Sequence, residues 1–275
     1  MILKDLKENL TYYNRFLRSG GLPNFLILGA QKAGTTSLFN YIETYGKNFL
    51  PPERKELYFF TEHFDKGLKY YRSFFPKCKK GQITGEATPD YLFYHKCPKR
   101  IKEALGNVKF IILLRNPIDR LISHYNFMNF TNKTNAIDPE PIDVAVRHEK
   151  DWVNLKDDFP INFNYSYKYY SYKSRGIYHK QLERWFDHFP RESFLIFDFD
   201  DFINDTHKVM NDVFTFLNID AEEIPNRKEN FPAYNKNINK GKNKLDPDTR
   251  KYLEDFFKPH NEALYKLINK NFKWL

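Results

Sequence analysis

The chain has 275 residues, of which 41% are hydrophobic, so it can build a core for one large α/β domain or two smaller ones. Lys and Arg outnumber Asp and Glu by 44 to 35, and the net charge of +9 predicts an anionic partner without choosing its kind. Its two cysteines exclude a disulfide-stapled scaffold and a Cys/His metal pattern, although one bridge between Cys78 and Cys97 remains open. The longest apolar run, 110–114, is far shorter than the roughly 20 residues that span a bilayer. We therefore expect a soluble, cytoplasmic protein with no stable membrane span.

The first twenty residues are expected to form a short N-terminal docking helix. Apolar side chains recur there at helical intervals, and a Gly-Gly-Leu-Pro sequence ends the pattern. The repeating positions are Leu3, Leu6, Leu10, Tyr13 and Phe16.

Residues 29–37 read GAQKAGTTS and follow the apolar run 25–28, which predicts a buried strand. Apolar residues at helical spacing come next, so the order is strand, glycine loop and helix. A helix N-terminus presents free N–H groups and a positive dipole end, which suits a phosphate. The spacing is that of the phosphate loop G-x-x-x-x-G-K-[ST], but Thr35 stands where its lysine belongs and Lys32 lies inside the loop.

A nucleoside-triphosphate enzyme needs that missing lysine, and a metal-holding aspartate at the end of a later strand. The later strand, 108–114, ends in Arg115 instead. The sequence thus favours a metal-free reaction on a less charged donor, with Lys32 facing the atom that bridges a phosphate to the transferred group. A P-loop nucleotide kinase remains the alternative, and a non-catalytic nucleic-acid-binding protein is a second one.

Arg115 and Ser123 could hold a second phosphate. Asn116 and Pro117 predict a helix start, and Ser123 lies about two turns into that helix. A guanidinium and a hydroxyl placed in this way can bind a phosphate. An arginine that caps a strand and an ordinary helix serine are the structural alternative.

The remaining chain continues the alternation. Helical spacing follows Gly176 as far as Phe189, a strand is expected at 194–199, and two more helices are expected at 209–217 and from Asp246 onward. Strands alternating with helices predict an α/β, three-layer fold with a central parallel sheet flanked by helices. Residues 131–175 are the least patterned and contain five close tyrosines, which either form a substrate-facing insertion or pack against the sheet.

Several segments resemble one family. GAQKAGTTSL is similar to the 5′-phosphosulfate loop, and LLRNPIDRLISHY to the 3′-phosphate motif, of sulfotransferases that use 3′-phosphoadenosine 5′-phosphosulfate (PAPS). RKELYFF (54–60), TGEATPDYL (84–92), RGIYHKQLERWFDHFPRE (175–192) and FFKPHNEALYKL (256–267) resemble the bacterial sulfotransferase family, which is related to the domains that modify heparan sulfate. The resemblance covers most of residues 24–268. It implies a P-loop-like fold, one sulfotransferase domain over 1–275, PAPS as donor co-substrate and no required metal.

The resemblance also implies residue roles. Lys32 would stabilise charge on the leaving phosphate, and Glu56 would take the proton of the acceptor. The residues implied to bind the nucleotide are Lys32, Ala33, Gly34, Thr35, Thr36, Ser37, Arg115, Ser123, Tyr178, Lys240, Gly241 and Lys242. Glu56 could instead pair with Lys32 or Arg54, and the reserve bases are His63 and Glu86.

Two departures bear on the acceptor. Residues 220–245 contain no cysteine, and Ala87 stands where some heparan sulfate enzymes have a lysine. Both favour the bacterial-type family over a heparan sulfate substrate. We expect PAPS and its desulfo product PAP as partners, a small metabolite or glycan as acceptor, and no nucleic acid.

Overall fold

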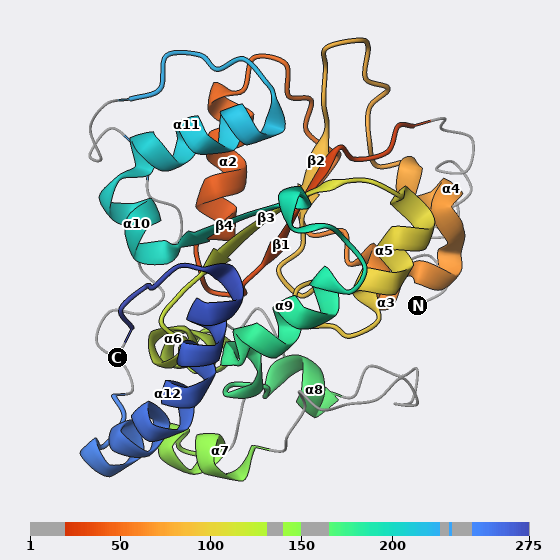
Figure 1. The fold of residues 1–275 in the computed structure, drawn as a ribbon. Helices are drawn as coiled ribbons and strands as arrows, with labels where there is room; N and C mark the ends of the chain where they lie inside the picture. The colour runs from red at the N-terminus through yellow and green to blue at the C-terminus, as the bar shows by residue number, and fades with distance from the viewer. Residues whose placement is uncertain (1–19, 131–139, 150–164, 226–230, 233–243, 275) are drawn as a thin grey trace.

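A parallel sheet forms the centre of the computed structural model (Figure 1). The structure describes residues 20–130, 140–149, 165–225, 231–232 and 244–274. Within these residues the sheet has four strands in the order β2-β1-β3-β4, and all neighbouring strands are parallel. The strands are β1 (Phe25–Gly29), β2 (Gly85–Ala87), β3 (Lys109–Leu114) and β4 (Phe194–Asp198). The predicted parallel α/β sheet is confirmed.

The central strands are buried because both of their faces are covered. Every residue of β1 is buried, and so is every residue of β3 after Lys109, as continuous apolar runs in parallel sheets require. In the register, Phe25 lies opposite Gly85 and Lys109. A Cβ at position 85 would lie 2.5 Å from the Phe25 ring, so only glycine fits there. The sequence did not predict β2, which has three residues and carries a charged one, Glu86, at its centre.

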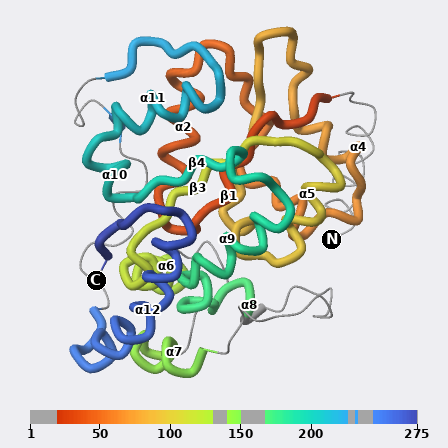
Figure 2. The backbone as a smooth tube through the Cα atoms, in the orientation of Figure 1, coloured from red at the N-terminus to blue at the C-terminus, as the bar shows by residue number. Residues whose placement is uncertain are grey.

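Two groups of helices cover the sheet. One group contains α2 (Thr35–Tyr45), α10 (Phe199–Asn204) and α11 (Thr206–Leu217), and the other contains α6 (Pro117–Phe130), α9 (Tyr178–Phe186) and α12 (Pro247–Ile268) (Figure 1). The backbone leaves β1 through α2 and returns to the centre of the sheet as β3, a path that can be followed in Figure 2, and it forms the edge strand β2 in between. The shorter helices are α3 (Phe59–Glu62), α4 (Gly67–Arg72), α5 (Cys97–Leu105), α7 (Ile142–His148) and α8 (Tyr165–Tyr169), with 3-10 turns at Phe64–Lys66, Ser174–Gly176 and Arg191–Ser193.

The helix starts follow the capping residues that the sequence offers. Asn116 Oδ1 accepts the N–H of Ile118 at 2.9 Å before α6, and Asp246 Oδ1 accepts the N–H of Thr249 at 2.7 Å before α12. The predicted cap positions Asn116 and Asp246 are therefore confirmed. The strand expected at 194–199 ends one residue early, because Asp198 caps α10.

The tyrosines of the 131–175 region divide between the two interpretations. Tyr167 and Tyr172 are 2% and 0% exposed, and the Tyr167 ring stacks 4.8 Å from that of Phe93. These two side chains belong to the core, whereas Tyr169 and Tyr170 are half-buried. Most of the expected insertion and nearly all of the expected N-terminal helix lie outside the described residues.

Neither cysteine is bonded, since Cys78 and the buried Cys97 are both free thiols. No helix in the described part of the chain combines the length and the apolar character needed to cross a membrane.

Candidate active site

The glycine loop, Arg115 and Glu56, all singled out by the sequence, lie at the carboxyl edge of the sheet. The loop 30–34 follows β1, Arg115 follows β3, and Phe199 follows β4. Glu56 also reaches this edge, because its N–H donates to the Ala87 carbonyl at the end of β2. In the order β2-β1-β3-β4 the chain adds β2 on one side of β1 and then β3 on the other, so the strand order reverses between β1 and β3. Ligands of open parallel sheets bind outside the carboxyl ends of the strands at such a switch point.

The glycine loop leads into α2 without a side-chain cap. Gly34 stands at the N-cap with φ of 88°, in the left-handed region, and no side chain caps the helix. The first N–H groups of α2 thus keep their donor capacity for an anion. Thr35 is buried, while Thr36 and Ser37 are half-buried beside it, and Ala33 is fully buried.

Lys32 and Arg115 lie together at the switch point. The Arg115 guanidinium donates to the Lys32 carbonyl at 3.1 Å and lies over the Phe199 ring at 4.7 Å. The Lys32 ammonium lies 4.2 Å from the centre of the Phe127 ring on α6. These contacts bring the segments after β1, β3 and β4 into one cationic centre.

Tyr178 contacts Arg115 from within the core, and Ser123 is buried on the helix that follows Arg115. Tyr178 is 1% exposed, and its hydroxyl donates to the Arg115 carbonyl at 2.9 Å. Burial raises the pKa of Tyr178 to about 12, so the hydroxyl stays a donor. Ser123 is buried on α6, which begins two residues after Arg115. The nucleotide roles of these residues stay predictions, and Lys240, Gly241 and Lys242 lie outside the described residues.

Glu56 presents a partly exposed carboxylate at the same edge. Lys55 Nζ contacts its Oε1 at 2.5 Å, and the Tyr58 hydroxyl donates to its Oε2 at 2.7 Å. The ion pair of Glu56 is thus with Lys55, rather than with the Lys32 or Arg54 that the alternative named. About a third of the Glu56 side chain is exposed, so a substrate can reach it.

Left-handed backbone concentrates here. Among the described non-glycine residues with positive φ, Lys32 (70°), Glu56 (62°) and Tyr58 (51°) belong to the site. Such conformations cost of order 1–3 kcal/mol each and tend to persist where function needs them.

The two reserve bases differ from Glu56. Glu86 has no exposed surface and accepts hydrogen bonds from the hydroxyls of Tyr71 (2.5 Å), Thr88 (3.0 Å) and Tyr91 (3.1 Å). Burial raises the pKa of Glu86, and the three hydroxyls oppose that rise. Glu86 therefore anchors β2 to its neighbours. Burial, with Lys66 nearby, lowers the pKa of His63, which is only partly buried.

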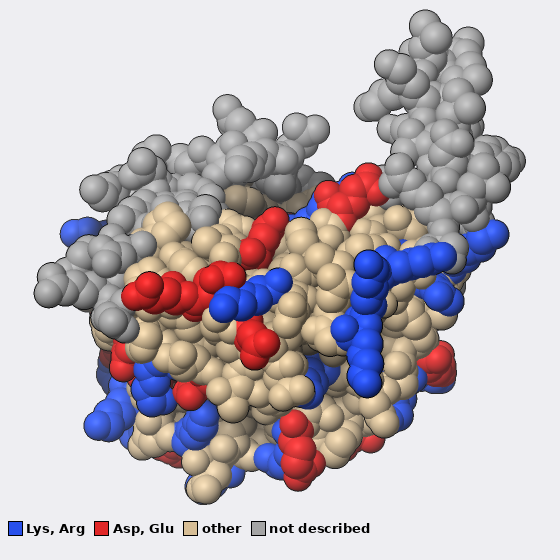
Figure 3. All heavy atoms as spheres, turned by 90° about the horizontal axis from the view of Figure 1, so that it is seen from above, with Lys and Arg blue, Asp and Glu red and all other residues tan. Residues whose placement is uncertain are grey.

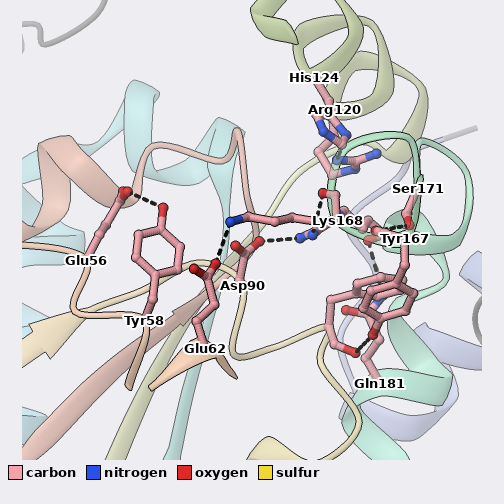
Figure 4. A network of polar contacts seen from close by, with 12 residues as sticks. Glu56, Tyr58, Glu62, Asp90, Arg120, His124, Tyr167, Lys168, Ser171 and Gln181 are labelled. Atoms are coloured by element: carbon pink, nitrogen blue, oxygen red, sulfur yellow. Dashed lines mark hydrogen bonds and ion pairs between the residues drawn. The ribbon is translucent and has the colours of Figure 1, made fainter. Parts of the chain in front are cut away.

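Sequence reasoning missed a polar network beside Glu56 (Figure 4). Arg175 pairs with the buried Asp90 at 2.7 Å and also donates to the Lys168 carbonyl on α8 at 3.1 Å. The Lys168 ammonium in turn contacts Glu62 at 2.5 Å. Glu62 lies just beyond RKELYFF, but its partner is 106 residues away, and no local pattern marks such a pair.

One face of the molecule carries charges of both signs. On the face in Figure 3, Lys and Arg side chains are interspersed with Asp and Glu, without the continuous basic surface typical of a nucleic-acid interface. Within the described residues no group of three or more His, Cys, Asp or Glu side chains could hold a metal ion.

Comparison with known proteins gives one consistent result. The family model described as "Sulfotransferase domain" matches residues 22–262. Heparan sulfate glucosamine 3-O-sulfotransferase 3B1 of Homo sapiens is 28% identical over 92% of this chain and 65% of its own length. Membrane-associated sulfotransferase kil1 of Dictyostelium discoideum is 23% identical over 92% of this chain and 66% of its own length. The chain thus spans just under two thirds of the length of these relatives.

Solved structures agree on the fold. A sulfotransferase from Alicyclobacillus acidocaldarius superposes with a TM-score of 0.69 at 25% identity, covering 92% of this chain and 99% of that one. Mouse sulfotransferase SULT7A1 complexed with PAP gives a TM-score of 0.56 at 15% identity, covering 94% of this chain and 92% of that one. At this identity the likeness is one of fold alone. The expected P-loop-like α/β fold is confirmed.

Proposed function

The chain belongs to the sulfotransferase domain family, and from this premise we propose that it transfers a sulfuryl group from PAPS to a hydroxyl or amine of an acceptor. The observation that carries the proposal is the contact between Arg115 and the Lys32 carbonyl at the β1/β3 switch point. It brings together two segments that we predicted, from the sequence, to bind two separate phosphates of one donor. A triphosphate donor would not need two separate phosphate sites.

The glycine loop would hold the 5′-phosphosulfate. The uncapped N-terminus of α2 and the hydroxyls of Thr35, Thr36 and Ser37 supply donors for the phosphate. As the acceptor oxygen bonds to sulfur, the bond from sulfur to the phosphate oxygen breaks and PAP leaves. The Lys32 ammonium would stabilise the negative charge that develops on the departing phosphate.

Arg115 and Ser123 would hold the 3′-phosphate. A guanidinium gives two parallel donors that match a phosphate, and stacking on Phe199 limits its rotation. Tyr178 fixes the backbone at Arg115 and would act through it. The basic segment Lys240–Lys242 is proposed to close over the same phosphate on the basis of the resemblance.

Glu56 would take the proton of the acceptor. It is accessible, unlike Glu86, and two neighbouring donors orient it. The relatives named as heparan sulfate glucosamine 3-O-sulfotransferases support a glycan as acceptor, and a small metabolite is the other class proposed. A cytoplasmic location belongs to the same proposal and agrees with the two free thiols.

Calorimetry tests the donor. We expect adenosine 3′,5′-bisphosphate to bind without metal, and ATP with Mg²⁺ to bind far more weakly. The opposite order would support the kinase alternative, and retention of RNA or DNA at physiological salt without bisphosphate binding would support the nucleic-acid alternative. An acceptor screen with radiolabelled PAPS, followed by mass spectrometry of the product, then identifies the acceptor.

A further inference from the structure

Tyr58 lies between the candidate base and α8 (Figure 4). On one side its hydroxyl donates to Glu56 Oε2 at 2.7 Å, and on the other its ring centre lies 5.6 Å from Lys168 Nζ. We propose that Tyr58 is a positioning residue that holds Glu56 for proton transfer, and that Lys168 keeps the Tyr58 ring in place. This inference rests on the proposed function and adds to it a residue that comes from neither phosphate motif.

The backbone holds Tyr58 in one orientation. Glu56 and Tyr58 are both left-handed, and the intervening Leu57 is 1% exposed. Directly after Tyr58, the N–H of Phe59 donates to the buried Tyr91 hydroxyl at 2.9 Å. The left-handed backbone at Glu56 and Tyr58 is unfavourable, and it persists because the flanking residues are fixed in the core. The turn thereby directs the carboxylate and the phenol toward each other.

Tyr58 remains a donor at any working pH. Burial raises its pKa well above the ordinary value, and the nearby carboxylates of Asp90, Glu56 and Glu62 raise it further. The Lys168 ammonium faces the Tyr58 ring, and Lys55 contacts the other carboxylate oxygen of Glu56. The phenol therefore stays protonated and keeps donating its hydrogen bond to Glu56 Oε2.

Lys168 links the turn to α8. Its ammonium contacts Glu62 at 2.5 Å, and its own carbonyl accepts a hydrogen bond from Arg175. Arg175 is fixed in turn by the buried Asp90. The charge of Lys168 is thus held within the range of a cation–π contact to the Tyr58 ring.

The proton balance of the step is simple. The acceptor O–H or N–H gives its proton to the Glu56 carboxylate as the bond to sulfur forms and PAP departs. Tyr58 neither gains nor loses a proton. It restricts the rotation of the carboxylate, with Lys55 on the other oxygen.

Tyr58→Phe tests the proposal, because it keeps the ring and removes the hydroxyl. A hydrogen bond to a charged group is worth enough that kcat should fall roughly ten- to hundredfold. PAP affinity and the KM for PAPS should stay within about twofold, so that the loss falls on kcat alone. Tyr252→Phe is the matched control, because it removes a hydroxyl that contacts Lys173 at 3.0 Å from α12. It should leave kcat, PAP affinity and the KM for PAPS unchanged.

A double-mutant cycle separates positioning from a structural role. If Tyr58 acts through Glu56, Tyr58→Phe should cost little more than about twofold when made in a Glu56→Gln background. Lys168→Met should lower kcat several-fold with PAP affinity unchanged, whereas Lys208→Met, at the exposed pair with Asp212, should do nothing.

The outcomes are distinct. Equal losses from Tyr58→Phe in both backgrounds, or a wild-type kcat in the single variant, overturn the positioning role while sulfuryl transfer stands. A wild-type protein that neither binds PAP nor transfers sulfate overturns the proposed function, and the positioning role with it. Melting temperatures near wild type show that the variants fold.

Discussion

Replacing Gly34 by alanine should damage both stability and nucleotide binding, and the structure lets the two causes be separated. Gly34 has φ of +88°, and a Cβ there would lie 3.0 Å and 3.3 Å from two atoms of the Phe199 ring. The left-handed backbone alone costs an alanine roughly 1–2 kcal/mol. Forcing the methyl against the ring adds about 1–3 kcal/mol, as overpacking usually does. The expected loss in free energy of unfolding is about 2–5 kcal/mol.

Gly81 provides the matched control. Its φ is +86°, and no described atom lies within 4 Å of its Cβ position. Gly81→Ala should therefore show only the backbone cost, about 1–2 kcal/mol. Urea unfolding of both variants measures the difference, with the slope compared to wild type.

Nucleotide affinity gives the second readout. Displacing Phe199 removes the ring over which the Arg115 guanidinium lies. A cation–π contact of up to about 1 kcal/mol corresponds to roughly fivefold weaker PAP binding by calorimetry, and Gly81→Ala should bind normally. Equal unfolding free energies for the two variants, or unchanged PAP affinity for Gly34→Ala, would refute the packing that links the loop to Arg115.

Three further predictions concern single side chains. Lys32→Ala should abolish most turnover in a PAPS assay, and near wild-type rates would show that the assigned role is wrong. Glu56→Gln should lower turnover with PAP affinity nearly unchanged, whereas equal loss of both would identify a structural carboxylate. Burial raises the pKa of Asp198 from 3.8 to about 6, despite two hydrogen bonds from Trp274. The folded state therefore binds this proton more tightly than the unfolded state. As the pH rises from 4 to 6, the stability of the wild type should fall relative to that of Asp198→Asn. A difference in melting temperature between the two proteins that stays constant across this range would contradict the prediction.

The sequence by itself determined the elements whose signals are local. Continuous apolar runs predicted β1 and β3, and Asn116 and Asp246 predicted where α6 and α12 begin. Each of these signals lies within a few residues of the feature it specifies, so no knowledge of the fold was needed. The spacing of GAQKAGTTS likewise placed the glycine loop between a strand and a helix.

Only the tertiary structure decided which distant groups meet. β2 is too short and too polar to show a period, and it is a strand because Gly85 fits against Phe25 and because hydroxyls satisfy the buried Glu86. Tyr58 and Lys168 are 110 positions apart, and their contact depends on how α8 packs. Strand order and side-chain partners arise from long-range packing, which local patterns of residue type do not record. The same packing buried Tyr178 behind Arg115, 63 residues earlier in the chain.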